Sequence, residues 1–441
     1  MSLSPRSRIF AWASYDFANH AFATSVLSVI FNVYFVRTLV PAAGVHVLGL
    51  TVPGESLWGY LVSSVMAVVL VLSPALGALS DRYALKRASL AFTAAIGIAA
   101  TMTLFFARPG NLGFTCLMAF IANLGYQMSL VFYNAFLNEL GTDETKGRTS
   151  GLGFAFGYVG GGLCLALNLA MLSRPAFFHL ASSDGTLAVR ASVLVAGLWW
   201  LVFSLPAVFF VKDATPAVEP LRPVAFVRAS TEALLQLRHT VRETIARVDL
   251  GRFLVAFLIY NDGIQTVLLM ASVFGAKALG MASSDLAACY LMIQFVAFGG
   301  AMAAGAMADK AGHKGVIIAT LVVFLLCVGW AAIIRRPSEF WVLGIFIGLV
   351  MGGAQAASRS LYSLLVPAHK AGEFFALFSI VGKAASLLGP LVFGIAAQAW
   401  GIRPAVAMIG AFFLVGGAIL CRVDEKRGRA LALVPVENPI R

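Results

Sequence analysis

The sequence predicts an all-α membrane protein whose twelve transmembrane helices form two parallel six-helix repeats. Of the 441 residues, 60% are hydrophobic and only 12% charged, and the mean hydropathy is +0.88, whereas soluble domains are about 25% charged. Twelve apolar runs each have roughly the 20 residues that a helix needs to cross a bilayer. Short motifs recur in the two halves at a constant spacing. A soluble enzyme is excluded, because no soluble core could bury so much apolar surface.

The apolar runs are long, continuous and rich in glycine, alanine and leucine, which favours helices over the alternating strands of a membrane barrel. The first run is not a cleavable signal, because it is too long and contains Asp16. The predicted spans are residues 10–36, 57–79, 88–107, 112–138, 150–172, 188–211, 252–278, 285–307, 315–334, 339–365, 374–399 and 402–421.

Most of the 32 lysine and arginine residues fall in loops on one side of the membrane when the N-terminus is placed in the cytoplasm. This asymmetry follows the positive-inside rule and predicts that both termini are cytoplasmic, in the inner membrane if the chain is bacterial. The net charge of +12 therefore reflects topology, and no basic motif with interleaved aromatics indicates nucleic-acid binding. The five cysteines have no metal or disulfide spacing, so we expect no metal and no cofactor.

The longest polar interruption, residues 212–251, divides the spans six and six. Its part from 225 to 248 has apolar residues on one side and arginines mostly on the other, which predicts an amphipathic helix on the cytoplasmic membrane surface. A soluble regulatory role is the alternative. The predicted divisions are an N-terminal bundle (1–211), a linker (212–251), a C-terminal bundle (252–421) and a cytoplasmic tail (422–441).

Two pairs of motifs repeat between the halves. GALSDRYALKR (77–87) follows the second span and GAMADKAGHK (305–314) follows the eighth, and Gly147-Arg148 corresponds to Gly372-Glu373. Parallel repeats of this kind are typical of transporters that rock about a central site. Glycines at every fourth position of the fifth and tenth spans indicate close helix packing or dimerisation, and we expect packing within a monomer.

The repeated aspartates Asp81 and Asp309 lie in short loops on the predicted cytoplasmic side. A carboxylate there can cap a helix terminus or pair with a base on a neighbouring helix, and so hold one conformation closed. The alternative is a turn whose charges serve only topology. The candidate gating residues are Asp81, Arg82, Glu139, Arg148, Asp309, Lys310 and Glu373.

Four charged residues lie inside predicted spans, namely Asp16, Asp262, Arg359 and Lys383. Each costs about 2.5–3.5 kcal/mol at a helix centre unless it is paired or wetted. Counted at ~1.5 Å per residue, all four lie about 9–14 Å from the cytoplasmic start of their spans. Matching depth on four helices predicts one shared polar cavity. The alternative is a set of buried salt bridges and interhelical hydrogen bonds that stabilise the bundle.

Polar neighbours of these charges extend the predicted cavity along spans 1, 4, 7 and 10. Arg359 is our candidate for binding a carboxylate, and Asp16 or Asp262 for binding an amine or carrying a coupling proton. His20 fits a packing role as well as a proton relay. The substrate or coupling candidates are Asp16, Asn19, His20, Asn261, Asp262, Gln265, Gln355, Ser358, Arg359 and Lys383.

Several stretches together resemble the vacuole effluxer-like branch of the major facilitator superfamily, in order from residue 11 to about residue 421. The most specific are YDFANHAFAT (15–24), YNDGIQT (260–266) and GGAQAASRSLYSLLVP (352–367). The resemblance implies a twelve-helix secondary transporter whose fungal relatives are associated with releasing amino acids from the vacuole. The first loop departs from the superfamily signature at Ala84, where the signature has glycine, and at Leu85, where a base is usual.

These observations predict a secondary active transporter that moves a small polar solute, with amino acids as candidates and a proton as the coupling ion. Its partners would be the solute, the bilayer and the proton. The alternative is a non-transporting receptor or assembly factor on the same fold. We expect no enzyme, because HExxH, P-loop and GxSxG motifs are all absent, and the missing P-loop also argues against ATP-driven transport.

Overall fold

The computed structural model describes residues 4–47, 50–181, 185–214, 240–385 and 388–433, and most of these residues are helical. Among them, eleven helical stretches are long and apolar enough to cross a membrane. The remaining predicted span, 374–399, consists of two shorter helices, α14 (Ala371–Ala384) and α15 (Leu388–Trp400). The predicted all-helical membrane fold is confirmed, and residues 386 and 387, between α14 and α15, lie outside the described residues.

The first half of the chain contains a two-stranded antiparallel hairpin, β1 and β2, between its first two spans. The elements of this half are α1 (Pro5–Phe22), the π-helix η1 (Ala23–Val29), α2 (Phe31–Tyr34), the π-helix η2 (Phe35–Leu39), β1 (Val45–Val47), β2 (Leu50–Val52), α3 (Gly54–Arg82), α4 (Lys86–Thr103), the short helix η3 (Leu104–Phe106), α5 (Leu112–Ala135), α6 (Leu137–Leu140), α7 (Lys146–Ser173) and α8 (Leu187–Phe210).

In the second half, every described element is a helix. They are α10 (Val248–Leu279), α11 (Ser283–Ala311), α12 (His313–Ala331), α13 (Pro337–Leu365), the short helix η4 (Ala368–Lys370), α14, α15, α16 (Ile402–Cys421) and α17 (Glu425–Ala432).

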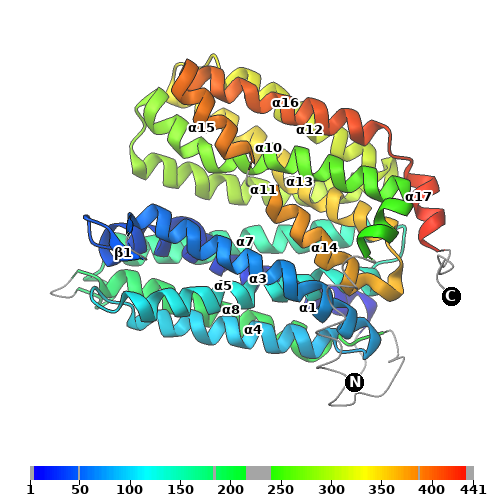
Figure 1. The fold of residues 1–441 in the computed structure, drawn as a ribbon, viewed down its shortest axis with the longest axis horizontal. Coiled ribbons are helices and arrows are strands. Elements are labelled where there is room, and N and C mark those ends of the chain that lie inside the picture. The colour runs from blue at the N-terminus through cyan, green and yellow to red at the C-terminus, as the bar shows by residue number, and fades with distance from the viewer. Residues whose placement is uncertain (1–3, 48–49, 182–184, 215–239, 386–387, 434–441) are drawn as a thin grey trace. The chain divides into compact units, whose positions relative to one another are not determined.

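Backbone contacts divide the chain into two compact units. Unit 1 comprises Met1–Ser73, Ala84–Tyr133 and Phe156–Asp213, and unit 2 comprises Pro74–Tyr83, Asn134–Ala155 and Ala214–Arg441. In unit 1, α8 packs against α1 and α4; in unit 2, α13 packs against α11 and α12, and α16 against α10 and α12 (Figure 1). Unit 2 thus includes the end of α3, the end of α5 and the start of α7, all from the first half of the sequence.

Most of the amphipathic helix predicted for 225–248 lies outside the described residues. Residues 240–246 are helical. Arg247, expected on the polar face, is only 6% exposed, whereas the apolar Ile245 is 69% exposed. The exposed Ile245 fits an apolar face turned to lipid, and Arg242 on the predicted polar face is exposed as well, so only the buried Arg247 departs from the predicted pattern. The membrane-surface role stays a prediction.

The glycine ladder of the tenth span packs against α11. A Cβ atom added at Gly352 would lie 2.5 Å from the carbonyl oxygen of Ala297, and one added at Gly348 would lie 3.1 Å from Cβ of Val296. These glycines therefore allow two helices of unit 2 to approach closely, which is packing within the fold.

Ala84, in the turn between α3 and α4, has a left-handed backbone with φ of +52°. This is the position at which the superfamily signature has glycine, and a non-glycine residue in this conformation costs about 1–2 kcal/mol. We predict that Ala84→Gly raises the free energy of unfolding by about 0.5–1 kcal/mol. Glycine relieves the backbone strain, but part of this gain is offset because glycine increases the conformational entropy of the unfolded chain.

The measurement is the thermal unfolding midpoint of the purified protein in detergent. Ala99→Gly is the matched control, because Ala99 is exposed within α4 and glycine there should lower stability by about 1 kcal/mol. Equal losses from both substitutions would contradict strain at Ala84.

Candidate functional site

Asp16 is a buried carboxylate on α1 in unit 1. Its side chain is 3% exposed, and the Tyr133 hydroxyl donates a hydrogen bond of 2.8 Å to Oδ2. His20 follows one turn later, with Nδ1 3.8 Å from Asp16 Oδ1 and 3.1 Å from the Asp16 carbonyl oxygen. A carboxylate, a phenol and an imidazole in one cluster can hold and exchange a proton.

Aromatic packing fixes the shape of this cluster. Trp12 stacks on Tyr133 with ring centroids 4.5 Å apart, and its indole N–H donates to the Tyr133 carbonyl at 2.9 Å. Tyr158 on α7 meets His20 edge-on at 5.7 Å. Gly157 leaves room for the imidazole, because a Cβ there would lie 2.4 Å from His20 Nδ1.

Asn19, one turn from Asp16 on α1, is fully buried. Neither atom of its side-chain amide has a hydrogen-bond partner among the described residues. Burying an amide without partners costs about 1–3 kcal/mol, and most buried polar groups are satisfied. Asn19 therefore remains a candidate for contacting water or a polar solute.

In unit 2, Asn261 and Asp262 on α10 contact the end of α14 and the start of α15. The Asn261 amide donates to the carbonyl of Gly382, near the end of α14, at 3.3 Å. The backbone N–H of Gly389, in the first turn of α15, donates to both Asp262 oxygens at 2.9 Å. Helix ends leave backbone groups without helical partners, which is costly where water is absent. The Asn261–Asp262 pair therefore supports these two helix ends.

Lys383 lies in the last turn of α14 and is partly exposed. A cation there is favoured by the partial negative charge of the helix C-terminus. In the part of the chain that the structure describes, Lys383 has no ion pair.

Arg359 on α13 is 2% exposed and joins three helices of unit 2. Its Nε and Nη2 donate to the hydroxyl and carbonyl of Ser150 at 3.0 and 2.7 Å, and Nη1 donates to Asn134 at 3.1 Å. The guanidinium also lies over the Phe154 ring, 4.0 Å from its centroid. These contacts tie α13 to the end of α5 and the start of α7, and the carboxylate-binding role predicted for Arg359 stays a prediction.

The other predicted polar residues of unit 2 have smaller roles in the described contacts. Ser358 shares a 2.7 Å hydrogen bond with Tyr260 of α10. Gln265 and Gln355 are partly exposed. Asp16, Asn19 and His20 belong to unit 1, and the predicted shared cavity stays a prediction.

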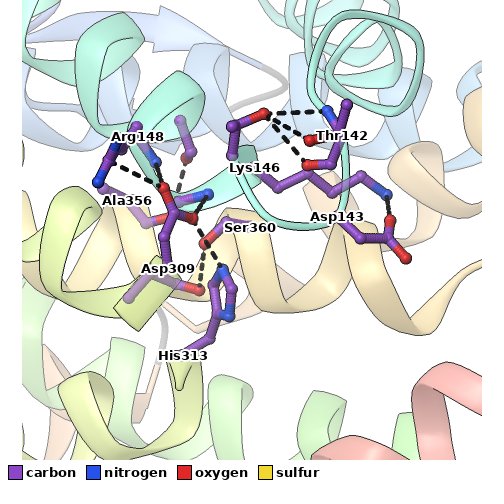
Figure 2. Close-up of polar contacts among 12 residues, drawn as sticks. Thr142, Asp143, Lys146, Arg148, Asp309, His313, Ala356 and Ser360 are labelled. Atoms are coloured by element: carbon purple, nitrogen blue, oxygen red, sulfur yellow. Dashed lines mark hydrogen bonds and ion pairs between the residues drawn. The ribbon is translucent and has the colours of Figure 1, made fainter. Parts of the chain in front are cut away.

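Asp309, at the end of α11, caps the first turn of α7. It accepts the backbone N–H groups of Gly147 and Arg148 at 2.7 and 3.0 Å, and the Arg148 Nε lies 3.5 Å from Oδ2 (Figure 2). Asp81, at the end of α3, accepts the N–H of Glu373 in the first turn of α14 at 3.2 Å. Each repeated aspartate therefore caps a helix from the other half of the sequence.

Glycines let these capped helices approach at backbone distance. A Cβ at Gly305 would lie 2.5 Å from the Gly147 carbonyl oxygen, and a Cβ at Gly77 would lie 2.5 Å from that of Gly372. The repeated motifs therefore meet each other: the motif at 77–87 contacts Gly372-Glu373, and the motif at 305–314 contacts Gly147-Arg148.

The remaining gating candidates divide into two groups. Glu139 accepts the Ala214 N–H at 2.8 Å, and the buried Glu373 accepts the Thr240 hydroxyl. Arg82 and Lys310 have exposed side chains. The neighbouring aspartates Asp81 and Asp309, by contrast, have buried carboxylates that cap helices.

Sequence reasoning missed two further capping acids. Asp213, after the sixth span, accepts the N–H groups of Lys86 and Arg87 at 2.9 and 3.3 Å. Glu425, after the twelfth span, accepts those of His313 and Lys314 at 3.3 and 3.1 Å. The available signal was their position: each is an acid in the polar stretch that follows the last span of its half.

Comparison with known proteins agrees with this architecture. The family model described as "Vacuole effluxer Atg22 like" matches residues 4–433. An uncharacterized MFS-type transporter, YxiO of Bacillus subtilis (strain 168), is 26% identical over 421 residues, which cover 94% of each chain. Autophagy-related protein 22 of Yarrowia lipolytica is 24% identical over 315 residues, covering 65% of this chain and 52% of that protein. The chain spans about half the length of this fungal relative.

Two solved structures share the fold. The human organic anion transporter MFSD10 (TETRAN) has a TM-score of 0.70 at 13% identity, covering 95% of this chain and all of that one. The proton:xylose symporter XylE has a TM-score of 0.69 at 13% identity, covering 96% and 97%.

The Asn261–Asp262 pair yields a prediction about stability. Asp262→Ala should lower the free energy of unfolding by about 1–3 kcal/mol, because it leaves the buried Gly389 N–H without its partner, and Asn261→Ala should lower it by less, because the Gly382 carbonyl is only partly buried. Asp262→Asn keeps one acceptor oxygen and should lose less.

Thermal unfolding in detergent measures these losses. Ser360→Ala is the control, since that buried hydroxyl donates to Ala357 within its own helix. If Asp262→Ala proves as stable as Ser360→Ala, the carboxylate does not support the start of α15.

Proposed function

The chain belongs to the vacuole effluxer Atg22-like family and is a membrane transporter of the major facilitator type; we propose that it moves a small zwitterionic solute, with amino acids as the best-fitting class. Transport would proceed by alternating access coupled to a proton. The membrane-spanning fold and the family favour this function over a receptor or assembly factor.

Lys383 is the observation that carries the proposal. An ionised lysine inside a span costs about 2.5–3.5 kcal/mol, and here no ion pair with a described residue offsets that cost. A substrate carboxylate would offset it during transport. Arg359 is less suited to this role in the present conformation, because all three of its guanidinium nitrogens donate to Ser150 or Asn134.

Asp16 is the proposed carrier of the coupling proton. Its carboxylate is buried, accepts the Tyr133 hydroxyl, and lies near His20. A buried carboxylate changes its protonation state readily when its surroundings alternate between wet and dry. Asn19, whose amide is without partners among the described residues, is the proposed neutral contact to the solute.

The caps made by Asp81 and Asp309 are the proposed gate. Each joins helix ends from both halves of the sequence on the side where we place the cytoplasm and both termini. Opening this side requires both carboxylates to release their N–H partners. For a bacterial chain the inner membrane is the proposed location, and a monomer contains both caps.

The direct test is uptake of isotope-labelled amino acids into proteoliposomes. We predict that Lys383→Gln lowers the transport rate of the accepted solute at least about tenfold, since the loss of one charge-assisted contact costs about 1.5–3 kcal/mol, and that Lys383→Arg retains part of it. Lys277→Gln, at an exposed position of α10, is the matched control. Normal transport by Lys383→Gln would overturn the assignment of Lys383, and the dissipation of no solute gradient would overturn transport of this class.

A second variant separates coupling from movement. Asp16→Asn should abolish accumulation driven by an imposed pH gradient but retain exchange of labelled for unlabelled solute, because an amide cannot carry the proton. Asp285→Asn, at an exposed acid, should accumulate solute normally. Accumulation by Asp16→Asn that still follows the pH gradient would contradict coupling through Asp16.

A further inference from the structure

The C-terminal helix α17 is fixed to unit 2 by ion pairs at two of its arginines. Arg427 binds Asp249 of α10 through Nε and Nη2 at 2.6 and 2.8 Å. Arg429 binds Asp143, in the turn before α7, at 2.9 Å. Burial raises the pKa of the Asp143 carboxyl, but Lys146 and Arg429 outweigh this effect and lower it, so the carboxylate stays charged. The tail helix is thus joined to both halves of the sequence.

Glu425, the first residue of α17, contacts the start of α12. Besides accepting two backbone N–H groups there, its Oε1 lies 3.0 Å from Nδ1 of His313. The other ring nitrogen of His313, Nε2, lies 3.9 Å from Oδ1 of Asp309. Figure 2 shows His313 beside Asp309. The His313 side chain is only 5% exposed, so a buried imidazole lies between the α17 carboxylate and the carboxylate that caps α7.

We propose that Glu425 and His313 are positioning residues for the Asp309 cap, and that protonation of His313 strengthens this cap. Nε2 of His313 has no hydrogen-bond partner among the described residues. A neutral imidazole carries one N–H, whereas the protonated ring carries two and a positive charge that attracts the Asp309 carboxylate 3.9 Å away. The C-terminal helix would therefore adjust the hold on the start of α7 according to the pH on its own side of the membrane.

Histidine is the side-chain type that can change its charge between about pH 5 and 8, whereas the charged groups around His313 keep theirs. Arg148 pairs with Asp309, and the Lys314 ammonium donates to the carbonyls of Cys421 and Val423; both residue types stay cationic between about pH 5 and 8. Burial raises the pKa of Glu425, but hydrogen bonds from His313 and Lys314 outweigh it and lower the pKa, so Glu425 stays anionic.

The first half contains a natural control. Asp213 caps α4 as Glu425 caps α12, but Lys86 occupies the place of His313. Any pH dependence caused by His313 should therefore appear at the start of α7 and be absent at the start of α4.

Hydrogen exchange of backbone amides, measured on the full chain in detergent between pH 5.5 and 8 and corrected for intrinsic rates, tests the proposal. The amides of Gly147 and Arg148 should lose about five- to tenfold protection between the low and the high end of this pH range, because the charged contact is lost. The amides of Lys86 and Arg87 should keep theirs.

Variants decide the cause. His313→Gln should show low protection of Gly147 and Arg148 at every pH, and His313→Lys should show high protection at every pH. Glu425→Gln should remove most of the pH dependence, whereas Asp213→Asn should leave it intact. A pH-dependent cap that persists in His313→Gln, or a wild-type cap that does not respond to pH, would overturn the proposal. Exchange needs no transported solute, so this result is independent of the proposed substrate.

Discussion

Carboxylates that accept the first N–H groups of helices are the interaction on which the arrangement of these helices depends. Five helices begin in this way: α4 on Asp213, α7 on Asp309, α12 on Glu425, α14 on Asp81 and α15 on Asp262. The first N–H groups of a helix lack helical partners and carry partial positive charge, so an anion satisfies both needs. Each acid comes from another helix or loop, so every cap also fixes how two segments meet.

Charged residues that cap or join helices can be distinguished from charged residues that are candidates for transport. Asp262 resembles a substrate-binding acid in the sequence, yet its carboxylate accepts the Gly389 N–H at the start of α15. Arg359 donates to Ser150 and Asn134. Lys383 has no ion pair with the described residues, and Asp16 is surrounded by groups that can exchange protons. The capping acids stabilise the fold, and the proposed substrate binding and proton coupling therefore fall to Lys383 and Asp16.

Hydropathy and charge placement suffice to predict the spans and the two repeats, because both respond directly to the bilayer. Hydropathy treats residues 374–399 as one span and does not register that α14 ends at Ala384. Pro390 was the available signal, because proline favours the first turn of a helix. The partners of Arg359 could not be predicted, because Ser150 and Asn134 are distant in sequence and meet α13 only in the fold. The capping roles of Asp213 and Glu425 were not predicted, because both residues resemble ordinary charged residues of loops.

The caps made by Asp81 and Asp309 are reciprocal: the first half supplies the acid for α14, and the second half supplies it for α7. Such an exchange of identical contacts is the pattern of an isologous interface between two copies of one subunit. Two identical copies would have to make both contacts with the same side chains. Because both halves belong to one chain, the surroundings of each cap can differ, and His313 beside Asp309 is a residue that only one of the two caps needs to have.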